Sequence, residues 1–235
     1  MTTQYRKILV IDVGGTNVKL RMSGQRAATK IPSGPSLTPT AMIAAVRTAT
    51  ADWQYDAVSI GYPGPVTRNK PHNEPHNLGP GWVNYSYQKA FTVPVRIIND
   101  AAMQALGGYR GGRMLFIGLG TGLGAALVVE GHLQPLELAH LPYRKEKTFE
   151  DYVGEASRKS RGKRRWERFV VDVVGMLSMA MQVETVLIGG GNARRLENVL
   201  DRLPSGTRLG TNADAFRGGV RLWHPAHERI AASLK

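Results

Sequence analysis

The chain has 235 residues, 42% of them hydrophobic, and contains no cysteine. This length allows one large domain or two small ones with a real core, while the lack of cysteine excludes disulfides and thiolate metal sites. The formal net charge of +13 gives a field that attracts polyanions, whether nucleic acid, phosphorylated metabolites or polyphosphate. We recognise no secretory signal and no stretch long and apolar enough for a bilayer, so we expect a cytoplasmic protein without membrane contact.

The first predicted elements are two strands joined by a glycine turn. An apolar run over 7–13 reaches Gly14 and Gly15, and apolar residues then alternate with Lys19 and Arg21 up to residue 22. This period of two predicts a returning strand, whereas a dinucleotide-binding turn would open a helix, and the P-loop pattern is absent from the sequence. A helix near 40–53, strands at 57–60 and 94–98, and a helix from Ala101 follow. The Pro/Gly/Asn-rich loop 61–82 is long enough to suggest a functional role.

The same plan repeats about a hundred residues later. Strands are predicted near 113–118 and 124–130, again around a glycine turn that leads into a strand and not a helix. Helices near 149–157 and 163–182, a strand at 185–188 and further helix complete this half. The second of these helices places six apolar residues on one face: Trp166, Phe169, Val170, Val173, Val174 and Leu177.

This duplication predicts an α/β fold with two similar halves and a cleft between them. We place the halves at residues 1–108 and 109–235, and the sequence leaves open whether the last helix packs back on the first half.

Several polar residues follow the predicted strands, and each has two readings. Asp100 is either a general base or the N-cap of the helix that starts at Ala101. His140, three residues after Glu137, is either a buried hydrogen-bonded histidine or a ligand contact. Lys19 either approaches a bound phosphate or points outward from its strand.

Taken in order, the motifs resemble those of the ROK family of sugar kinases. These proteins have the actin/hexokinase/Hsp70-type ATPase fold, which consists of two ribonuclease H-like domains with an interdomain cleft. Each motif alone is weakly specific, but their order and spacing match over roughly residues 7 to 220. The segments are DVGGTNVK (12–19), GYPGPV (61–66), NLGPGW (77–82), IIND (97–100), GLGTGLG (118–124), ELAH (137–140) and VLIGGGN (186–192). The segment TFEDYVG…GKRRWERFV (148–170) looks most similar to the polyphosphate glucokinase branch.

On the sugar side, the resemblance implies phosphoryl transfer to the 6-hydroxyl of a hexose, with glucose as the first choice. Asp100 would be the general base and Asn99 would hold a neighbouring hydroxyl. Glu150 would be the second sugar glutamate, although an acid in the first turn of a helix is equally well explained by the helix dipole. The expected sugar contacts are Pro63, Gly64, Asn77, Asn99, Asp100, Glu137, His140 and Glu150.

On the phosphate side, the resemblance implies a site made mostly of backbone amides. Glycine lets an amide approach a phosphate without a Cβ in between, and threonine adds a hydroxyl donor. Asp12 would hold Mg²⁺ through water. Asn192 would pass the adenine side of a nucleotide or simply cap a helix. The expected contacts are Asp12, Gly14, Gly15, Thr16, Lys19, Gly120, Thr121, Gly122, Gly189, Gly190, Gly191 and Asn192.

The chain departs from the family pattern in three places. Ala139 replaces a glycine of the family pattern. The cysteine-rich zinc loop is absent, so we expect no zinc site. Few residues precede the first motif, so we do not expect the DNA-binding segment of a repressor. The basic residues Arg161, Lys163, Arg164 and Arg165 form either a track for a polyanionic donor or a solvated helix entrance.

The sequence therefore predicts a glucokinase that uses polyphosphate, ATP or both, as a homodimer. Two alternatives remain, an ATP-only kinase for another hexose and a non-catalytic polyanion- or nucleic-acid-binding protein on a degenerate kinase fold. Retention of Asp100, Glu137 and His140 argues against the second, so we expect nucleic acid not to be the partner.

Overall fold

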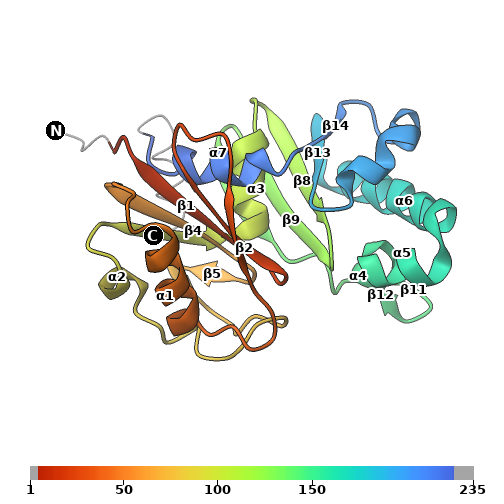
Figure 1. Ribbon diagram of the computed structural model, residues 1–235. Helices are drawn as coiled ribbons and strands as arrows, with labels where there is room; N and C mark the ends of the chain where they lie inside the picture. Colours follow the sequence, from red (N-terminus) through yellow and green to blue (C-terminus); the bar gives the residue numbers. More distant parts are fainter. Residues whose placement is uncertain (1–4, 225–235) are drawn as a thin grey trace. The chain divides into compact units, whose positions relative to one another are not determined.

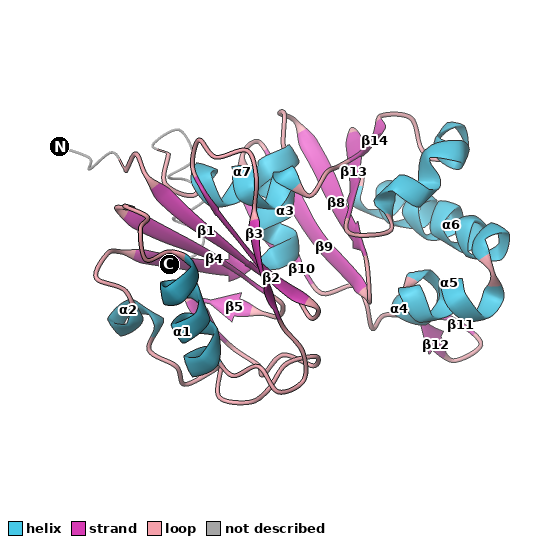
Figure 2. Ribbon diagram, in the orientation of Figure 1, coloured by secondary structure: helices cyan, strands magenta, loops and turns pink. Residues whose placement is uncertain are grey.

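A computed structural model describes residues 5–224 and divides the chain into two compact units (Figures 1 and 2). Met1–Met103 and Ala215–Lys235 form the first unit, and Gln104–Asp214 form the second. The boundary falls inside helix α3 (Asp100–Gly108). Each unit contains one five-stranded sheet of mixed direction.

In the first unit, the buried strand β1 (Ile8–Val13) lies at the centre of the sheet. It pairs antiparallel with β2 (Asn17–Met22) and parallel with β4 (Ala57–Tyr62). The outer strands are β3 (Thr29–Pro32) and β7 (Val95–Asn99), which give the order β3-β2-β1-β4-β7. Every residue of β1 and β4 is buried, as expected for strands covered on both faces.

Helices from distant parts of the sequence cover this sheet. Helix α1 (Pro39–Ala49) begins at the cap Thr38 and buries Met42, Ile43 and Val46 in the core. Helix α7 (Ala213–Arg221) belongs to the first unit from residue 215 onward and approaches the sheet closely. There Ser59 Oγ donates a hydrogen bond to the Gly219 carbonyl at 2.6 Å, which fixes α7 on β4. The smaller elements are β5 (Val66–Thr67), β6 (Lys70–Pro71) and α2 (Tyr87–Ala90).

The second unit repeats the plan of the first. Its strands have the order β10-β9-β8-β13-β14, with the same sequence of antiparallel and parallel pairings. Helix α6 (Lys163–Met181) buries Trp166, Val170, Val173, Val174 and Leu177, so the predicted apolar face is confirmed, with Phe169 half-buried. The remaining bounds are β8 (Arg113–Leu119), β9 (Leu123–Val129), β10 (His132–Leu136), β11 (Pro142–Arg144), β12 (Lys147–Thr148), α4 (Phe149–Val153), α5 (Glu155–Arg161), β13 (Thr185–Gly189), the 3₁₀ segment η1 (Ala193–Arg202) and β14 (Thr207–Leu209).

Two helix predictions require correction. The helix predicted at 149–157 is two helices, because Gly154 between them has extended backbone with φ −70° and ψ 168°. The helix predicted at 40–53 already ends at Ala49. Strands β3, β10 and β14 were not predicted, since they are short and mostly lack the alternation that marks a half-buried strand.

Of the helices described between residues 5 and 224, none is long and apolar enough to cross a membrane.

Candidate active site

In the first unit, the predicted site residues gather where the parallel strands β1, β4 and β7 end. The strand register aligns Asp12 of β1 with Gly61 of β4, and Gly61 with Ile98 of β7. Asn99 and Asp100 follow Ile98 directly. The carboxyl ends of parallel strands are where open α/β sheets bind their ligands.

Asp12 forms an ion pair with Lys19 across the first glycine hairpin. The two residues face each other in the register of β1 and β2, and Lys19 Nζ lies 3.2 Å from Asp12 Oδ2. The Asp12 side chain is only 10% exposed, so this charge pair is largely shielded from water. Lys19 therefore points toward Asp12, and its approach to a bound phosphate stays a prediction.

Asp100 is the first residue of α3, and its pKa is raised from its ordinary value of 3.8 to about 7. Desolvation by the surrounding protein is the main cause, and the nearby negative charge of Asp12 adds to it. The Ala101 amide, which donates to Asp100 Oδ1 at 2.8 Å, and the positive charge of Lys19 lower the pKa in part. A carboxyl with a pKa near neutrality can both accept and return a proton at physiological pH.

Asn99, and not Asp100, provides the side-chain cap at the start of α3. Its Oδ1 accepts from the Ala102 amide at 3.0 Å, and its Nδ2 donates to the Gly64 carbonyl at 3.1 Å. Asn99 thus braces the start of α3 against the predicted sugar loop. Its side chain still has one N–H that a sugar hydroxyl could accept from.

The loop 61–82 is held by its own hydrogen bonds and lies against the first glycine turn. The Glu74 carboxylate accepts from the amides of Gly81, Trp82 and Val83 at 3.0 to 3.2 Å. Predicted contacts Pro63 and Gly64 follow β4 directly, and both are half-buried. A Cβ added to Gly15 would lie 3.2 Å from the Asn77 Cβ, so these two predicted site residues are neighbours.

The first glycine turn uses part of its backbone internally. The Gly14 amide donates to the Asn17 carbonyl at 3.1 Å, so it is not available to a phosphate in this conformation. The exposed Gly15 and Thr16 are left as the phosphate candidates of this turn. Ser33, which the sequence did not single out, donates through its Oγ to the Gly14 carbonyl at 2.5 Å and through its amide to the Thr16 carbonyl at 3.0 Å.

In the second unit, Glu150 lies against the second glycine turn. Its Oε2 accepts from the Leu123 amide at 3.0 Å, and a Cβ on Gly122 would lie only 2.0 Å from that oxygen. A side chain at 122 would therefore displace the Glu150 carboxylate from this position. As in the first hairpin, one amide closes the turn, because Gly120 donates to the Gly122 carbonyl at 3.1 Å. Thr121 lies exposed between these two glycines.

Glu137 and His140 occupy a turn that is fastened to the start of α4. The Glu150 amide donates to the Ala139 carbonyl at 3.0 Å, which holds ELAH beside Glu150. Glu137 and His140 are both exposed, so the buried-histidine reading is wrong. Neither side chain has a hydrogen-bond partner among residues 5–224, which leaves both free for a ligand.

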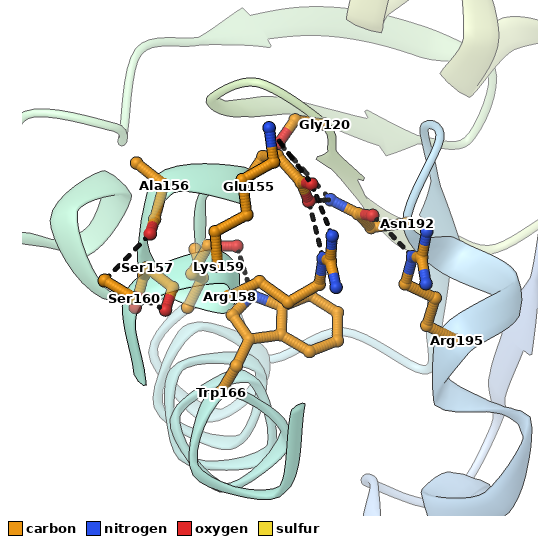
Figure 3. A network of polar contacts seen from close by, with 11 residues as sticks. Gly120, Glu155, Ala156, Ser157, Arg158, Lys159, Ser160, Trp166, Asn192 and Arg195 are labelled. Carbon is orange, nitrogen blue, oxygen red and sulfur yellow. Dashed lines mark hydrogen bonds and ion pairs between the residues drawn. The ribbon is translucent and has the colours of Figure 1, made fainter. Parts of the chain in front are cut away.

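A polar network joins the second glycine turn to the GGGN segment (Figure 3). The Glu155 amide donates to the Gly120 carbonyl at 3.0 Å. The Glu155 carboxylate accepts from Asn192 Nδ2 at 3.0 Å and from two nitrogens of Arg158 at 2.5 and 2.7 Å. The Arg158 contacts hold the pKa of Glu155 down at about 2. Arg195 Nε donates to Asn192 Oδ1 at 3.0 Å. Asn192 is therefore a cross-link, and its side chain does not cap η1.

The glycines of the GGGN segment are not equivalent. Gly190 has φ +82°, and a Cβ there would lie 2.3 Å from the Leu119 carbonyl oxygen. A Cβ on Gly189 would lie 2.6 Å from the Phe116 ring, whereas the space around Gly191 is open. Gly190 is thus fixed by the close approach of two backbones, and Gly191 is the glycine exposed to a ligand.

The four basic residues predicted as one track have two different environments. The Arg161 guanidinium lies 4.6 Å from the centre of the Tyr152 ring and Arg165 lies 6.0 Å from that of Phe169. Lys163 and Arg164 instead line a cavity of about 580 Å³ between α6 and η1. The cavity's other arginines, Arg168 and Arg202, were not among the predicted track residues.

Metal binding can be judged from the carboxylates present. No cluster of three potential metal ligands occurs in the described part of the chain. Asp12 offers one carboxylate oxygen that is not paired with Lys19, which fits a Mg²⁺ ion held mainly by donor phosphates and reached through water.

The family model of the ROK family matches residues 8–135, more than half of the sequence, so the chain belongs to the ROK family. No curated protein matches it. Among solved structures, an inorganic polyphosphate/ATP-glucomannokinase from Arthrobacter sp. strain KM is 23% identical, with a TM-score of 0.78 over 92% of this chain and 98% of that one. A ROK family glucokinase from Streptomyces griseus, in complex with glucose and AMPPNP, is 17% identical with a TM-score of 0.76 over 92% and 99%.

A ROK family transcriptional regulator, a homolog of the E. coli MLC protein, is also similar, with 14% identity and a TM-score of 0.72 over 97% of this chain and 79% of that one. At these identities, the neighbours establish the fold alone, which is that of the actin/hexokinase-type ATPases, as expected from the sequence.

Proposed function

We propose that the protein is a sugar kinase that transfers a phosphoryl group from polyphosphate or ATP to the 6-hydroxyl of glucose. Asp100 carries this proposal, because it combines a pKa near 7 with a position at the carboxyl end of β7, close to the charges of Asp12 and Lys19. Membership of the ROK family, which includes both kinases and regulators, is consistent with this role.

In the proposed reaction, the Asp100 carboxylate accepts the proton of the sugar hydroxyl as that oxygen attacks the terminal phosphorus. The new P–O bond forms while the bridging P–O bond breaks, and its electron pair leaves on ADP or on the shortened polyphosphate. Desolvation of Asp100 makes its carboxylate a stronger base than an exposed aspartate.

The proposed sugar contacts are the unpaired side chains of Glu137 and His140, together with Glu150, Asn99, Asn77, Pro63 and Gly64. A glutamate that accepts from adjacent hydroxyls selects among epimers, because the wrong epimer leaves a charged acceptor unpaired. Glu150 already accepts from the Leu123 amide, so its orientation is set before a sugar arrives.

The proposed donor contacts are the exposed backbone and hydroxyl groups of Gly15 and Thr16 in the first unit and of Thr121 and Gly191 in the second, together with the Lys19 side chain. When bound, Mg²⁺ would neutralise charge that develops on the donor phosphates, with Asp12 as its water-mediated protein contact. The Arthrobacter and Streptomyces neighbours, named for polyphosphate/ATP and bound to AMPPNP respectively, support both donors. A homodimer and a cytoplasmic location remain part of the proposal.

The decisive experiment measures glucose 6-phosphate formation with Mg²⁺ and either polyphosphate or ATP, for the wild type and Asp100→Asn. We expect the substitution to lower kcat by about 10²- to 10⁴-fold, as is usual for loss of a general base, while glucose affinity changes little. Asp52→Asn, an exposed aspartate after α1 in the same unit, is the matched control and should retain full activity.

Unchanged turnover in Asp100→Asn would show that another group is the base. If the wild type phosphorylates no hexose with either donor but still binds polyanions, the chain is a binding protein on a kinase fold.

A further inference from the structure

We propose that the cavity between α6 and η1 binds a segment of polyphosphate that lies beyond the phosphate being transferred. This inference rests on the proposed function in one respect only, namely that polyphosphate serves as a donor. The cavity measures about 580 Å³, and its charged lining consists of Lys163, Arg164, Glu167, Arg168 and Arg202. Four cations from two separate elements therefore surround one space.

The three arginines of this cavity carry charge that the protein does not compensate. Within residues 5–224, the side chains of Arg164, Arg168 and Arg202 form no ion pair and no hydrogen bond, and all three residues are exposed. Lys163 is different, because its Nζ lies 3.6 Å from Oε1 of the buried Glu167. Glu167 is 7% exposed and its Oε1 has no hydrogen-bond donor, so this carboxylate offsets mainly the charge of Lys163.

The start of α6 is electrostatically unfavourable without a ligand. Its first turn contains Lys163, Arg164 and Arg165 and no acidic residue, and no side chain caps it. Cations at a helix N-terminus interact unfavourably with the helix dipole, so these residues destabilise the start of α6. A local conflict of this kind is expected where function requires it, and a bound anion would relieve both the dipole and the repulsion among the arginines.

The cavity is connected to the phosphate turn through η1, which lines it, and through α5, which precedes the lining helix α6. Glu155 at the start of α5 and Asn192 just before η1 are tied to each other and to the turn at Gly120. Arg158 and Arg195 lie at this end of the two elements (Figure 3). From there, the chain of α5 leads into α6, and η1 ends at Arg202, so cations follow both elements from the turn to the cavity.

The lining also identifies the kind of polyanion. Binding of single-stranded nucleic acid normally combines cations with aromatic side chains on which bases stack. The residues that line this cavity include no aromatic ring, and the only apolar one is Val199. A linear polyphosphate needs charge alone, so the site favours it over nucleic acid.

The test compares charge-matched variants in a binding assay without glucose. Arg164→Gln/Arg202→Gln removes two charges that line the cavity, whereas Arg165→Gln/Arg194→Gln removes two exposed charges from the same elements outside it. Calorimetric titration with long-chain polyphosphate, tripolyphosphate and ATP gives the affinities. We expect the cavity variant to bind long-chain polyphosphate about tenfold more weakly and to lose about one unit of salt slope per arginine.

The same variant should bind ATP with nearly wild-type affinity, and the variant outside the cavity should lose less affinity for long chains. All four arginines are exposed, and an unchanged melting temperature will confirm that each variant is folded. The inference would be overturned if the two variants lost equal affinity for long-chain polyphosphate or if the wild type did not bind polyphosphate. It would also be overturned if the cavity bound a single-stranded oligonucleotide more tightly than polyphosphate. Cavity-dependent binding without phosphoryl transfer from polyphosphate would support the site and contradict the proposed donor, so the two failures are distinguishable.

Discussion

Asp12, Lys19 and Asp100 show how neighbouring charges set the chemistry of single residues. Burial and the charge of Asp12 raise the pKa of Asp100, while Lys19 opposes both. The ion pair with Lys19 also limits Asp12 to one open oxygen for a hydrated metal ion. The charges of Asp12 on β1 and Lys19 on β2 therefore act together on the Asp100 carboxyl at the start of α3.

At this scale we predict an acid limb in the pH dependence of activity. Because Asp100 must be deprotonated to act as a base, kcat/KM for glucose should fall about tenfold per pH unit below pH 7, as for a single essential ionisation. Measurement with saturating polyphosphate avoids the titration of ATP. Lys19→Met should move the limb to higher pH, because it removes a charge that lowers the Asp100 pKa. A limb that stays in place would contradict this assignment.

The same pKa shift predicts how Asp100→Asn changes stability with pH. Between about pH 4 and pH 7, the folded carboxyl retains a proton that the unfolded chain has released, so wild-type stability falls as pH rises through this window. Asparagine has no such dependence. The variant should therefore gain stability relative to the wild type from pH 4 to pH 7, by at most about 4 kcal/mol, and the difference should be constant above pH 7. Denaturant titrations at several pH values measure it, and a constant difference throughout would show that the pKa is not shifted.

At the scale of elements, the two hairpins and the GGGN connection are held by close backbone approaches. In each hairpin, one glycine amide donates a hydrogen bond within the turn, from Gly14 in the first and from Gly120 in the second. The GGGN connection passes so close to the end of β8 that Gly190 meets the backbone of Leu119. Glu155 and Asn192 then fasten this connection to the turn, so the phosphate contacts of the second unit are positioned as one assembly.

This closeness predicts different effects for adjacent glycines. Gly190→Ala combines a positive φ with a Cβ 2.3 Å from a carbonyl oxygen, and should cost roughly 2 to 4 kcal/mol. Gly191→Ala places its Cβ in open space and should change stability by no more than about 0.5 kcal/mol. Thermal unfolding compares the two, with an expected Tm decrease of roughly 5 to 15 °C for Gly190→Ala alone. Similar melting temperatures would mean that the connection relaxes without cost.

For the whole molecule, the formal charge of +13 acts beyond any single contact. Such a field speeds the arrival of polyanions and makes their binding depend on salt. The structure shows that part of this charge is already paired or stacked on aromatic rings, as at Arg158 and Arg161, while the arginines of the α6–η1 cavity are not.

We therefore predict that salt discriminates between the two donors. With four cations engaged, the KM for long-chain polyphosphate should rise about 50- to 150-fold between about 50 and 200 mM salt, whereas the KM for ATP should rise much less. Steady-state kinetics with both donors at matched ionic strength measures this. Equal salt effects would indicate that the basic surface does not hold the donor.

The sequence by itself determined the fold class, the duplicated plan and the positions of the glycine turns. These features depend on local signals, since apolar runs around the glycine turns mark β1, β8 and β9, alternation marks β2, and apolar residues at helical spacing mark α6. It also placed Asp100 at the end of a strand, where ligands of such sheets bind. The short edge strands and the break at Gly154 have no comparable periodic signal.

Only the tertiary structure decided which of the candidate residues meet. Lys19 faces Asp12 because of strand register, Asn99 donates to the carbonyl of Gly64 in a distant loop, and Glu155 reaches Asn192 across 37 positions of sequence. Arg202 joins Arg164 and Arg168 because η1 packs next to α6. Contacts between residues far apart in the chain arise from packing, and no local pattern encodes which partner each side chain will find.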